Sequence, residues 1–220
     1  MEERLAQRPS SCIKIVLFGP ESTGKTTLAS QLAAHYNVLW VKEYMREYLQ
    51  KKWDEEKSIC EPEDLLPIAE GQMKRENGLA AIAGKLLICD TNLLELKVYS
   101  EAYYSGFCPP LLLKHALNNH YHLYFLTYID VEWTPDDLRD KPDDRVGMFQ
   151  RFKAALKQNN KPFVVLKGNQ EERFKTAVSI IDNQLKKYKV KLSEKDKVQI
   201  KEKGIREQEV EDQIEIFKRG

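Results

Sequence analysis

The residues with the clearest chemical pattern lie in the segment Gly-Pro-Glu-Ser-Thr-Gly-Lys-Thr-Thr, which starts at Gly19. The segment fits the pattern G-x-x-x-x-G-K-[ST], which binds the phosphates of nucleoside triphosphates. Gly19 and Gly24 permit backbone angles that let the loop wrap phosphates and direct its N–H groups toward them. Lys25 is expected to reach the outer phosphates, and the Thr26 hydroxyl to ligate Mg²⁺. The predicted nucleotide-binding residues are Gly19, Glu21, Ser22, Thr23, Gly24, Lys25, Thr26 and Thr27.

The segments on either side of this loop predict the elements that must hold it. Residues 12–18 are mostly apolar and predict a buried strand, and Leu28, Leu32 and Tyr36 follow the loop at helical spacing. A glycine-rich turn could join a strand to a helix without binding anything. The strand and helix around the motif favour nucleotide binding, because helix N–H groups and the helix dipole attract anions.

Short apolar segments alternate with helical patterns along the rest of the chain. Further strands are predicted in residues 38–43, 85–90, 123–129 and 162–166. This alternation predicts an α/β fold, in which helices cover both faces of a parallel sheet. Ligands bind beyond the carboxyl ends of such strands, where Gly19, Glu43, Asp90 and Asp130 all fall.

Three charged residues at these strand ends are candidates for chemistry on the phosphates. Asp90 ends an apolar run and is predicted to be catalytic and to hold Mg²⁺ with Thr26, although a plain strand end has the same pattern. Glu43 could take the proton of an acceptor hydroxyl, or it could simply suit a helix start. Arg46 could hold an anion or the acceptor, or form a surface ion pair.

A loop rich in Asp, Pro and Arg occupies residues 130–144 and predicts a lid. Phosphate transfer to a hydroxyl must exclude water, because water would otherwise hydrolyse the triphosphate. Arg139 and Arg145 are predicted to be catalytic, since arginines closing over the phosphates offset developing charge. A solvated, charged loop remains the alternative interpretation.

Composition limits the partners of the chain. The formal net charge of +1 over 220 residues gives no global field for nucleic acid, and no apolar run approaches membrane-spanning length. The four cysteines show no C-x-x-C spacing, so we expect a cytoplasmic protein without disulfides or zinc. We expect a disordered leader (1–11), one phosphate-loop kinase domain (12–189) and a charged helical tail (190–220). The tail could contact another domain or subunit, or begin another domain.

Five ordered blocks within residues 12–188 resemble the ribosylnicotinamide kinase domain of the NadR family. They are the phosphate loop and residues 43–48, 64–72, 89–91 and 132–140. The resemblance implies a three-layer α/β sandwich like nucleoside and nucleotide kinases, with a five-stranded parallel sheet. It implies a kinase that uses ATP and Mg²⁺ to phosphorylate the 5′-hydroxyl of nicotinamide riboside. The product is nicotinamide mononucleotide, for NAD biosynthesis. The implied substrate-binding residues are Glu43, Tyr44, Arg46, Gln72, Asp90 and Trp133.

Two positions depart from the family pattern. Relatives have a tryptophan before the glutamate of the second block, where this sequence has Lys42, and a second stacking aromatic where it has residues 73–75, Met-Lys-Arg. Trp40 lies on the same face of the predicted strand as Lys42. These changes leave open a kinase for another nucleoside or small alcohol. A regulatory module that binds nucleotide without efficient catalysis is a separate alternative, because some proteins with this type of domain bind nucleotides or lipids.

Overall fold

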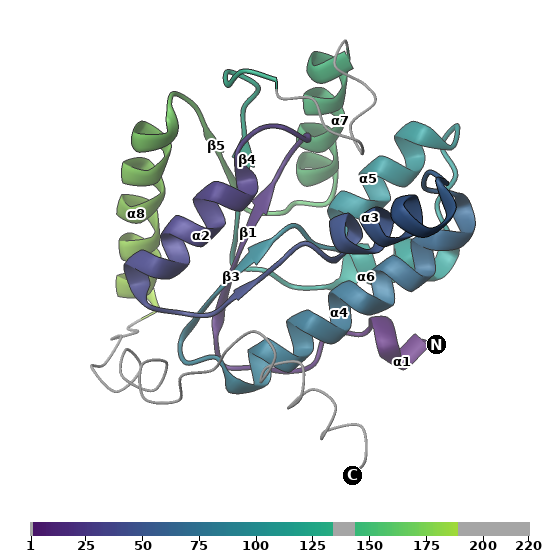
Figure 1. Ribbon diagram of the computed structural model, residues 1–220. Coiled ribbons are helices and arrows are strands. Elements are labelled where there is room, and N and C mark those ends of the chain that lie inside the picture. Colours follow the sequence, from purple (N-terminus) through teal and green to yellow (C-terminus); the bar gives the residue numbers. More distant parts are fainter. Residues whose placement is uncertain (1, 134–143, 189–220) are drawn as a thin grey trace.

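The computed structural model describes residues 2–133 and 144–188, and helices and strands alternate along them (Figure 1). The strands are β1 (Ile13–Phe18), β2 (Trp40–Val41), β3 (Leu86–Asp90), β4 (Leu123–Thr127) and β5 (Phe163–Leu166). The helices are α1 (Glu2–Leu5), α2 (Lys25–Tyr36), α3 (Tyr44–Glu56), α4 (Leu65–Ile82), α5 (Leu93–Tyr103), α6 (Pro110–Asn118), α7 (Arg145–Gln158) and α8 (Gln170–Lys187). A short 3-10 helix, η1 (Pro62–Asp64), precedes α4.

The strands form one five-stranded parallel sheet in the order β2-β3-β1-β4-β5. The predicted parallel sheet is therefore confirmed. Strand β1 lies at the centre, where Ile15 is paired with Ile88 on one side and with Leu123 on the other. Every residue of β1 is buried, because helices cover both faces of the sheet.

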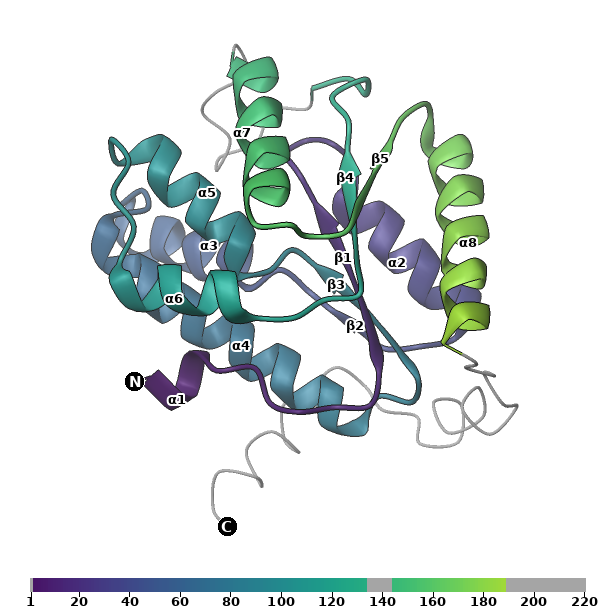
Figure 2. The ribbon, with the colours of Figure 1, turned by 180° about the vertical axis from the view of Figure 1, so that it is seen from behind.

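The side chains of β1 alternate between two cores. Ile15 and Leu17 pack with residues of α2 and α8, including Ala29 and Ile181. Residues on the opposite face, such as Phe18, pack with residues of α4, α5 and α7. Figures 1 and 2 show the two sets of helices on opposite sides of the sheet. This arrangement is the predicted three-layer sandwich.

Parallel pairing brings the ends of three strands together. Leu17 is paired with Asp90 at the end of β3, and Val41 with the neighbouring Cys89. The loop after β1 and the residues after β2 therefore start beside Asp90. The fold thus gathers the predicted strand-end residues at one edge of the sheet.

The amino-terminal segment differs from the prediction of a disordered leader. Within residues 2–11, Leu5 is fully buried against residues of α4, including Ile68. The side chain of Asn77 donates to the Ala6 carbonyl at 2.9 Å and accepts from the Arg8 N–H at 2.8 Å. The prediction is wrong for these residues, because one apolar side chain and a distant carboxamide give no local periodicity. Strand β2 is also shorter than the expected 38–43.

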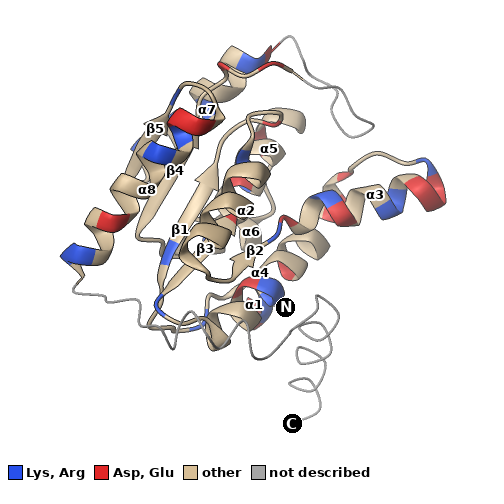
Figure 3. Ribbon diagram, turned by 60° about the vertical axis from the view of Figure 1, so that its left-hand side comes forward, with Lys and Arg blue, Asp and Glu red and all other residues tan. Residues whose placement is uncertain are grey.

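The surface carries both signs of charge, and Figure 3 shows Lys and Arg interspersed with Asp and Glu along α3 and α8. In the part of the chain that the structure describes, no helix combines the length and apolar character needed to cross a membrane. The predicted helical tail (190–220) and most of the predicted lid, including Arg139, lie outside the described residues.

Candidate active site

The phosphate loop depends on two glycines with positive φ. Gly19 has φ +139°, and a Cβ there would lie 2.7 Å from Thr127 Oγ1. Gly24 has φ +79° and precedes the first residue of α2, so the N–H groups of that helix face the loop. The Thr23 hydroxyl donates to the Pro20 carbonyl at 2.7 Å and lies 2.7 Å from the Thr127 hydroxyl. The predicted loop residues thus form one compact turn on the end of β4.

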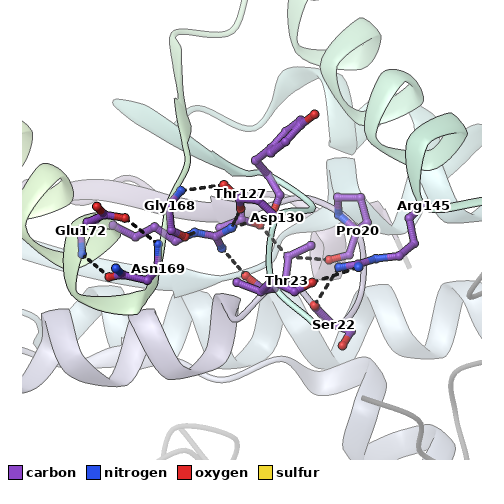
Figure 4. A network of polar contacts seen from close by, with 12 residues as sticks. Pro20, Ser22, Thr23, Thr127, Asp130, Arg145, Gly168, Asn169 and Glu172 are labelled. Atoms are coloured by element: carbon purple, nitrogen blue, oxygen red, sulfur yellow. Dashed lines mark hydrogen bonds and ion pairs between the residues drawn. The ribbon is translucent and has the colours of Figure 1, made fainter. Parts of the chain in front are cut away.

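A buried arginine on α8, Arg173, supports this loop. Figure 4 shows Thr23, Asp130 and Gly168, which belong to the same network of polar contacts. Arg173 donates to the carbonyls of Thr23 at 2.6 Å, Tyr128 at 2.8 Å and Gly168 at 2.9 Å. It also forms an ion pair with Asp130, which accepts from the Gly168 N–H at 2.6 Å. Asp130, one of the strand-end acids, thus serves this support network. Sequence reasoning missed Arg173, because a lone arginine within an amphipathic helix carries no signal of burial.

Lys25 contacts a buried glutamate that sequence reasoning also missed. Its ammonium donates to the carbonyls of Gly19 at 2.7 Å and Pro20 at 2.9 Å, and lies 3.2 Å from Glu95 Oε1. Glu95 Oε2 accepts from the Gly19 N–H at 3.3 Å. The sequence signal that could have pointed to Glu95 is the helix start at Asn92. Asn92 caps α5 by accepting from the Glu95 N–H.

Burial and charge shift the pKa values of this pair. Burial raises the pKa of Glu95 to about 8, although Lys25 opposes the shift. Burial alone would lower the pKa of Lys25, but Glu95, Glu43 and Asp90 outweigh it, and the net pKa is raised. Lys25 therefore stays protonated, which suits a group that must neutralise phosphate charge.

Asp90 and Thr26 meet as the sequence predicts. The Thr26 hydroxyl donates to Asp90 Oδ2 at 2.6 Å, while Asp90 Oδ1 is buried without a hydrogen-bond partner. Burial and then repulsion from Glu43 raise the pKa of Asp90 to about 7, opposed by Thr26 and Lys25. A buried carboxylate oxygen without a partner beside a threonine hydroxyl fits a hard cation with oxygen ligands, such as Mg²⁺.

The start of α3 is fixed by α4, and this places Glu43. The Tyr44 N–H donates to Gln72 Oε1 at 2.8 Å. The Tyr44 ring lies where a side chain at position 71 would be, since a Cβ on Gly71 would come within 2.0 Å of it. Glu43 immediately precedes the helix and, unlike Tyr44 and Gln72, lines a cavity whose wall also includes residues of the phosphate loop. The contacts of Tyr44 and Gln72 therefore position Glu43.

A cavity of about 580 Å³ connects the phosphate loop to a pocket between α3 and α5. Residues 21–27 line one part, and Glu43 and Arg46 lie on the wall with them. The remaining wall is largely apolar and aromatic, and consists of Met45, Leu49, Trp53, Ser58, Ile59, Cys60, Leu65, Leu96, Tyr99, Ser100, Tyr103 and Tyr104. The volume is within the range of pockets for small molecules.

The described end of the predicted lid contacts the phosphate loop. Arg145 donates to the Ser22 carbonyl at 3.3 Å and to the Val131 carbonyl at 3.0 Å. Its guanidinium lies 5.8 Å from the centre of the Trp133 ring. Arg145 therefore lies at the loop as expected, whereas Trp133 is not on the wall of the main cavity.

A family model described as "AAA domain" matches residues 14–173. The match covers most of the chain, and the chain belongs to this family. It is also 25% identical over 170 residues to the trifunctional NAD biosynthesis/regulator protein NadR of Salmonella typhimurium and to that of Escherichia coli. Each alignment covers 76% of this chain and 41% of the NadR protein, so the chain spans about two fifths of these relatives. The resemblance to NadR proteins is confirmed.

Solved structures show the same fold. A NadR protein in complex with NR has a TM-score of 0.68 at 20% identity, over 79% of this chain and 51% of that chain. A deoxyadenosine kinase from M. mycoides has a TM-score of 0.60 at 14% identity, over 78% of this chain and 100% of that chain. A thymidylate kinase from Ehrlichia chaffeensis has a TM-score of 0.53 at 15% identity, over 79% and 100%. The expected likeness to nucleoside and nucleotide kinases is confirmed for the fold.

Proposed function

We propose that this chain is an ATP-dependent kinase that phosphorylates the 5′-hydroxyl of nicotinamide riboside to give nicotinamide mononucleotide. The observation that carries the proposal is one continuous cavity that joins the phosphate loop to an aromatic pocket, with Glu43 on its wall. A phosphate donor and a nucleoside acceptor could lie end to end in such a cavity. The alignment with NadR proteins and the structural likeness to a NadR protein bound to NR support this acceptor.

The residues of the site have separate roles in the proposed reaction. Lys25 would exchange the carbonyls of Gly19 and Pro20 for phosphate oxygens and stabilise the transferring group. Glu43 would accept the proton of the attacking hydroxyl. Thr26 and Asp90 would hold Mg²⁺, which neutralises phosphate charge when bound. Arg145, which already contacts the loop, would add a positive charge beside the phosphates.

A second acceptor class is supported by the positions where relatives have stacking aromatics. Met73 is fully buried in the core, and Arg75 forms an ion pair with Glu47 and lies 4.7 Å from the Tyr44 ring centre. Neither residue, nor Lys42, lines the main cavity. A kinase for another nucleoside is therefore the alternative proposal.

Acceptor-dependent ADP release with a panel of nucleosides, nicotinamide riboside included, tests the proposal. We expect the highest kcat/KM for nicotinamide riboside. Lys25→Ala should bind this nucleoside but lose turnover by about 100- to 1,000-fold, as for other single charge-stabilising contacts. If another nucleoside is the better substrate, the alternative acceptor class holds; if no acceptor stimulates ADP release, the kinase proposal fails.

A further inference from the structure

The ammonium of Lys25 is fully engaged by protein acceptors in this structure. It donates to the carbonyls of Gly19 and Pro20 at 2.7 and 2.9 Å. It also lies 3.2 Å from Glu95 Oε1. An ammonium has three hydrogens, so these three acceptors account for all of them. Lys25 can therefore reach a phosphate oxygen only by giving up at least one of these contacts.

Glu95 is the acceptor that loses most when the ammonium moves. Its side chain is 2% exposed, and Oε1 accepts no hydrogen bond from the described residues. Oε2 accepts from the Gly19 N–H at 3.3 Å, so the same carboxylate also contacts the backbone of the loop. A buried carboxylate that loses its counter-ion is strongly destabilised, whereas a carbonyl that loses one donor costs less.

Other carboxylates face Glu95 from neighbouring elements and increase this cost. Burial has the largest effect on Glu95 and raises its pKa to about 8. Glu43, which precedes α3, and Asp90, at the end of β3, also raise this pKa. Lys25, at the start of α2, opposes them. When Lys25 turns to a phosphate, Glu95 keeps the repulsive neighbours and loses the attractive one, so its neutral form is favoured further.

We propose that Glu95 is a positioning residue that competes with the phosphates of ATP for the Lys25 ammonium, and that its ionised form weakens nucleotide binding. Glu95 does not line the main cavity, so it acts through Lys25 and the loop. The inference rests on the proposed function, because that function brings phosphates to Lys25. As ATP binds, the ammonium exchanges Glu95 for a phosphate oxygen, and the carboxylate takes up one proton from solvent.

Calorimetric binding of a non-hydrolysable ATP analogue with Mg²⁺ tests the proposal. Glu95→Gln removes the charge but keeps the shape and an acceptor for the Gly19 N–H. At about pH 9, one unit above the pKa of Glu95, only about a tenth of this group is protonated. The unmodified protein should therefore bind the analogue about tenfold more weakly than Glu95→Gln. At about pH 6.5 the group is neutral in both proteins, and the difference should be less than about twofold.

Glu76→Gln is the matched control. Glu76 is also a fully buried carboxylate and lies 2.9 Å from the Lys14 ammonium. Lys14 is near the start of β1, whereas the phosphate loop follows the end of that strand. The control therefore weakens a buried ion pair away from the loop, and its affinity for the analogue should match that of the unmodified protein at both pH values. Asp90 is present in all of these proteins, so its own titration cancels in the comparison.

Steady-state kinetics at about pH 9 provide a second measurement. Glu95→Gln should lower the KM for ATP with kcat retained, because the change affects the ground state and the transition state equally. Loss of a merely structural contact would instead raise this KM. Circular dichroism identifies a variant that fails to fold, in which case Glu95→Met, which is also uncharged and of similar length, takes its place.

The outcomes separate the role of Glu95 from the reaction. Equal or weaker binding by folded Glu95→Gln at about pH 9 would overturn the inference even if nicotinamide riboside is phosphorylated. A gain that persists at about pH 6.5, or an equal gain in Glu76→Gln, would also overturn it. The expected gain without any acceptor-stimulated ADP release would support the role of Glu95 and reject the kinase function. No binding of the analogue by either protein would reject both.

Discussion

Replacement of Arg173 by alanine should uncouple the phosphate loop from α8. The side chain is 4% exposed, and it satisfies three backbone carbonyls and the Asp130 carboxylate. Arg173→Ala leaves these acceptors without their donor and the carboxylate without its counter-ion. Removing one partner of a buried, hydrogen-bonded charge pair costs about 3–5 kcal/mol. Asp130 is 28% exposed, so water replaces part of the lost interaction, and we expect the lower half of that range.

Urea denaturation measures this loss of unfolding free energy. With a denaturant slope of about 2 kcal/mol per molar urea, a loss of 3–4 kcal/mol moves the midpoint down by about 1.5–2 M. We also expect a raised KM for ATP, because Arg173 holds the Thr23 carbonyl within the loop.

Lys175→Ala is the matched control on the same helix. Lys175 forms an ion pair with Glu171, but the two side chains are 72% and 74% exposed. Such exposed pairs contribute at most about 0.5 kcal/mol, so the control midpoint should hardly move. A loss below about 1 kcal/mol in Arg173→Ala, or an unchanged KM for ATP, would refute the proposed support of the loop.

Three further changes test other parts of the structure. Glu43→Gln keeps the shape but removes the proton acceptor, so turnover should fall by about 100-fold or more with ATP affinity retained; full activity would reject Glu43 as the base. Glu76→Ala leaves Lys14, which is 4% exposed and 2.9 Å from Glu76 Oε1, buried without its partner, and should cost about 3–5 kcal/mol in urea denaturation. Asp64 has a lowered pKa, because its hydrogen bonds, above all that from Lys52, outweigh its burial. Its ionised form therefore stabilises the fold above about pH 4, and this contribution is lost on acidification. Asp64→Asn should consequently lose less stability than the unmodified protein between pH 5 and pH 3; equal losses would contradict this.

The fold could be predicted because its signals are local. The apolar run before Gly19 and the helical spacing after it identify the central strand and the first helix. Alternation of strands and helices then requires a parallel sheet, and the strand ends gather Thr26 beside Asp90. The resemblance in five blocks extended these local signals to a family.

The parts that sequence reasoning missed depend on contacts between distant residues. Glu95 and Arg173 reach the loop from helices that follow it by many residues, and neither belongs to a motif. Leu5 is buried by a helix that starts at residue 65. The aromatic wall required knowledge of how α3 faces α5, since Trp53 and Tyr103 have no common pattern in the sequence.

We propose that phosphate is transferred within the cavity from ATP to a nucleoside hydroxyl. The most direct measurement is mass spectrometry of the nucleoside products alongside ADP, with ATP, Mg²⁺ and nicotinamide riboside as the reactants. We expect nicotinamide mononucleotide and ADP in a one-to-one ratio, with the rate of formation of both lowered by about 100- to 1,000-fold in Lys25→Ala. ADP that accumulates without any mononucleotide, or at the same rate without acceptor, would contradict the claim.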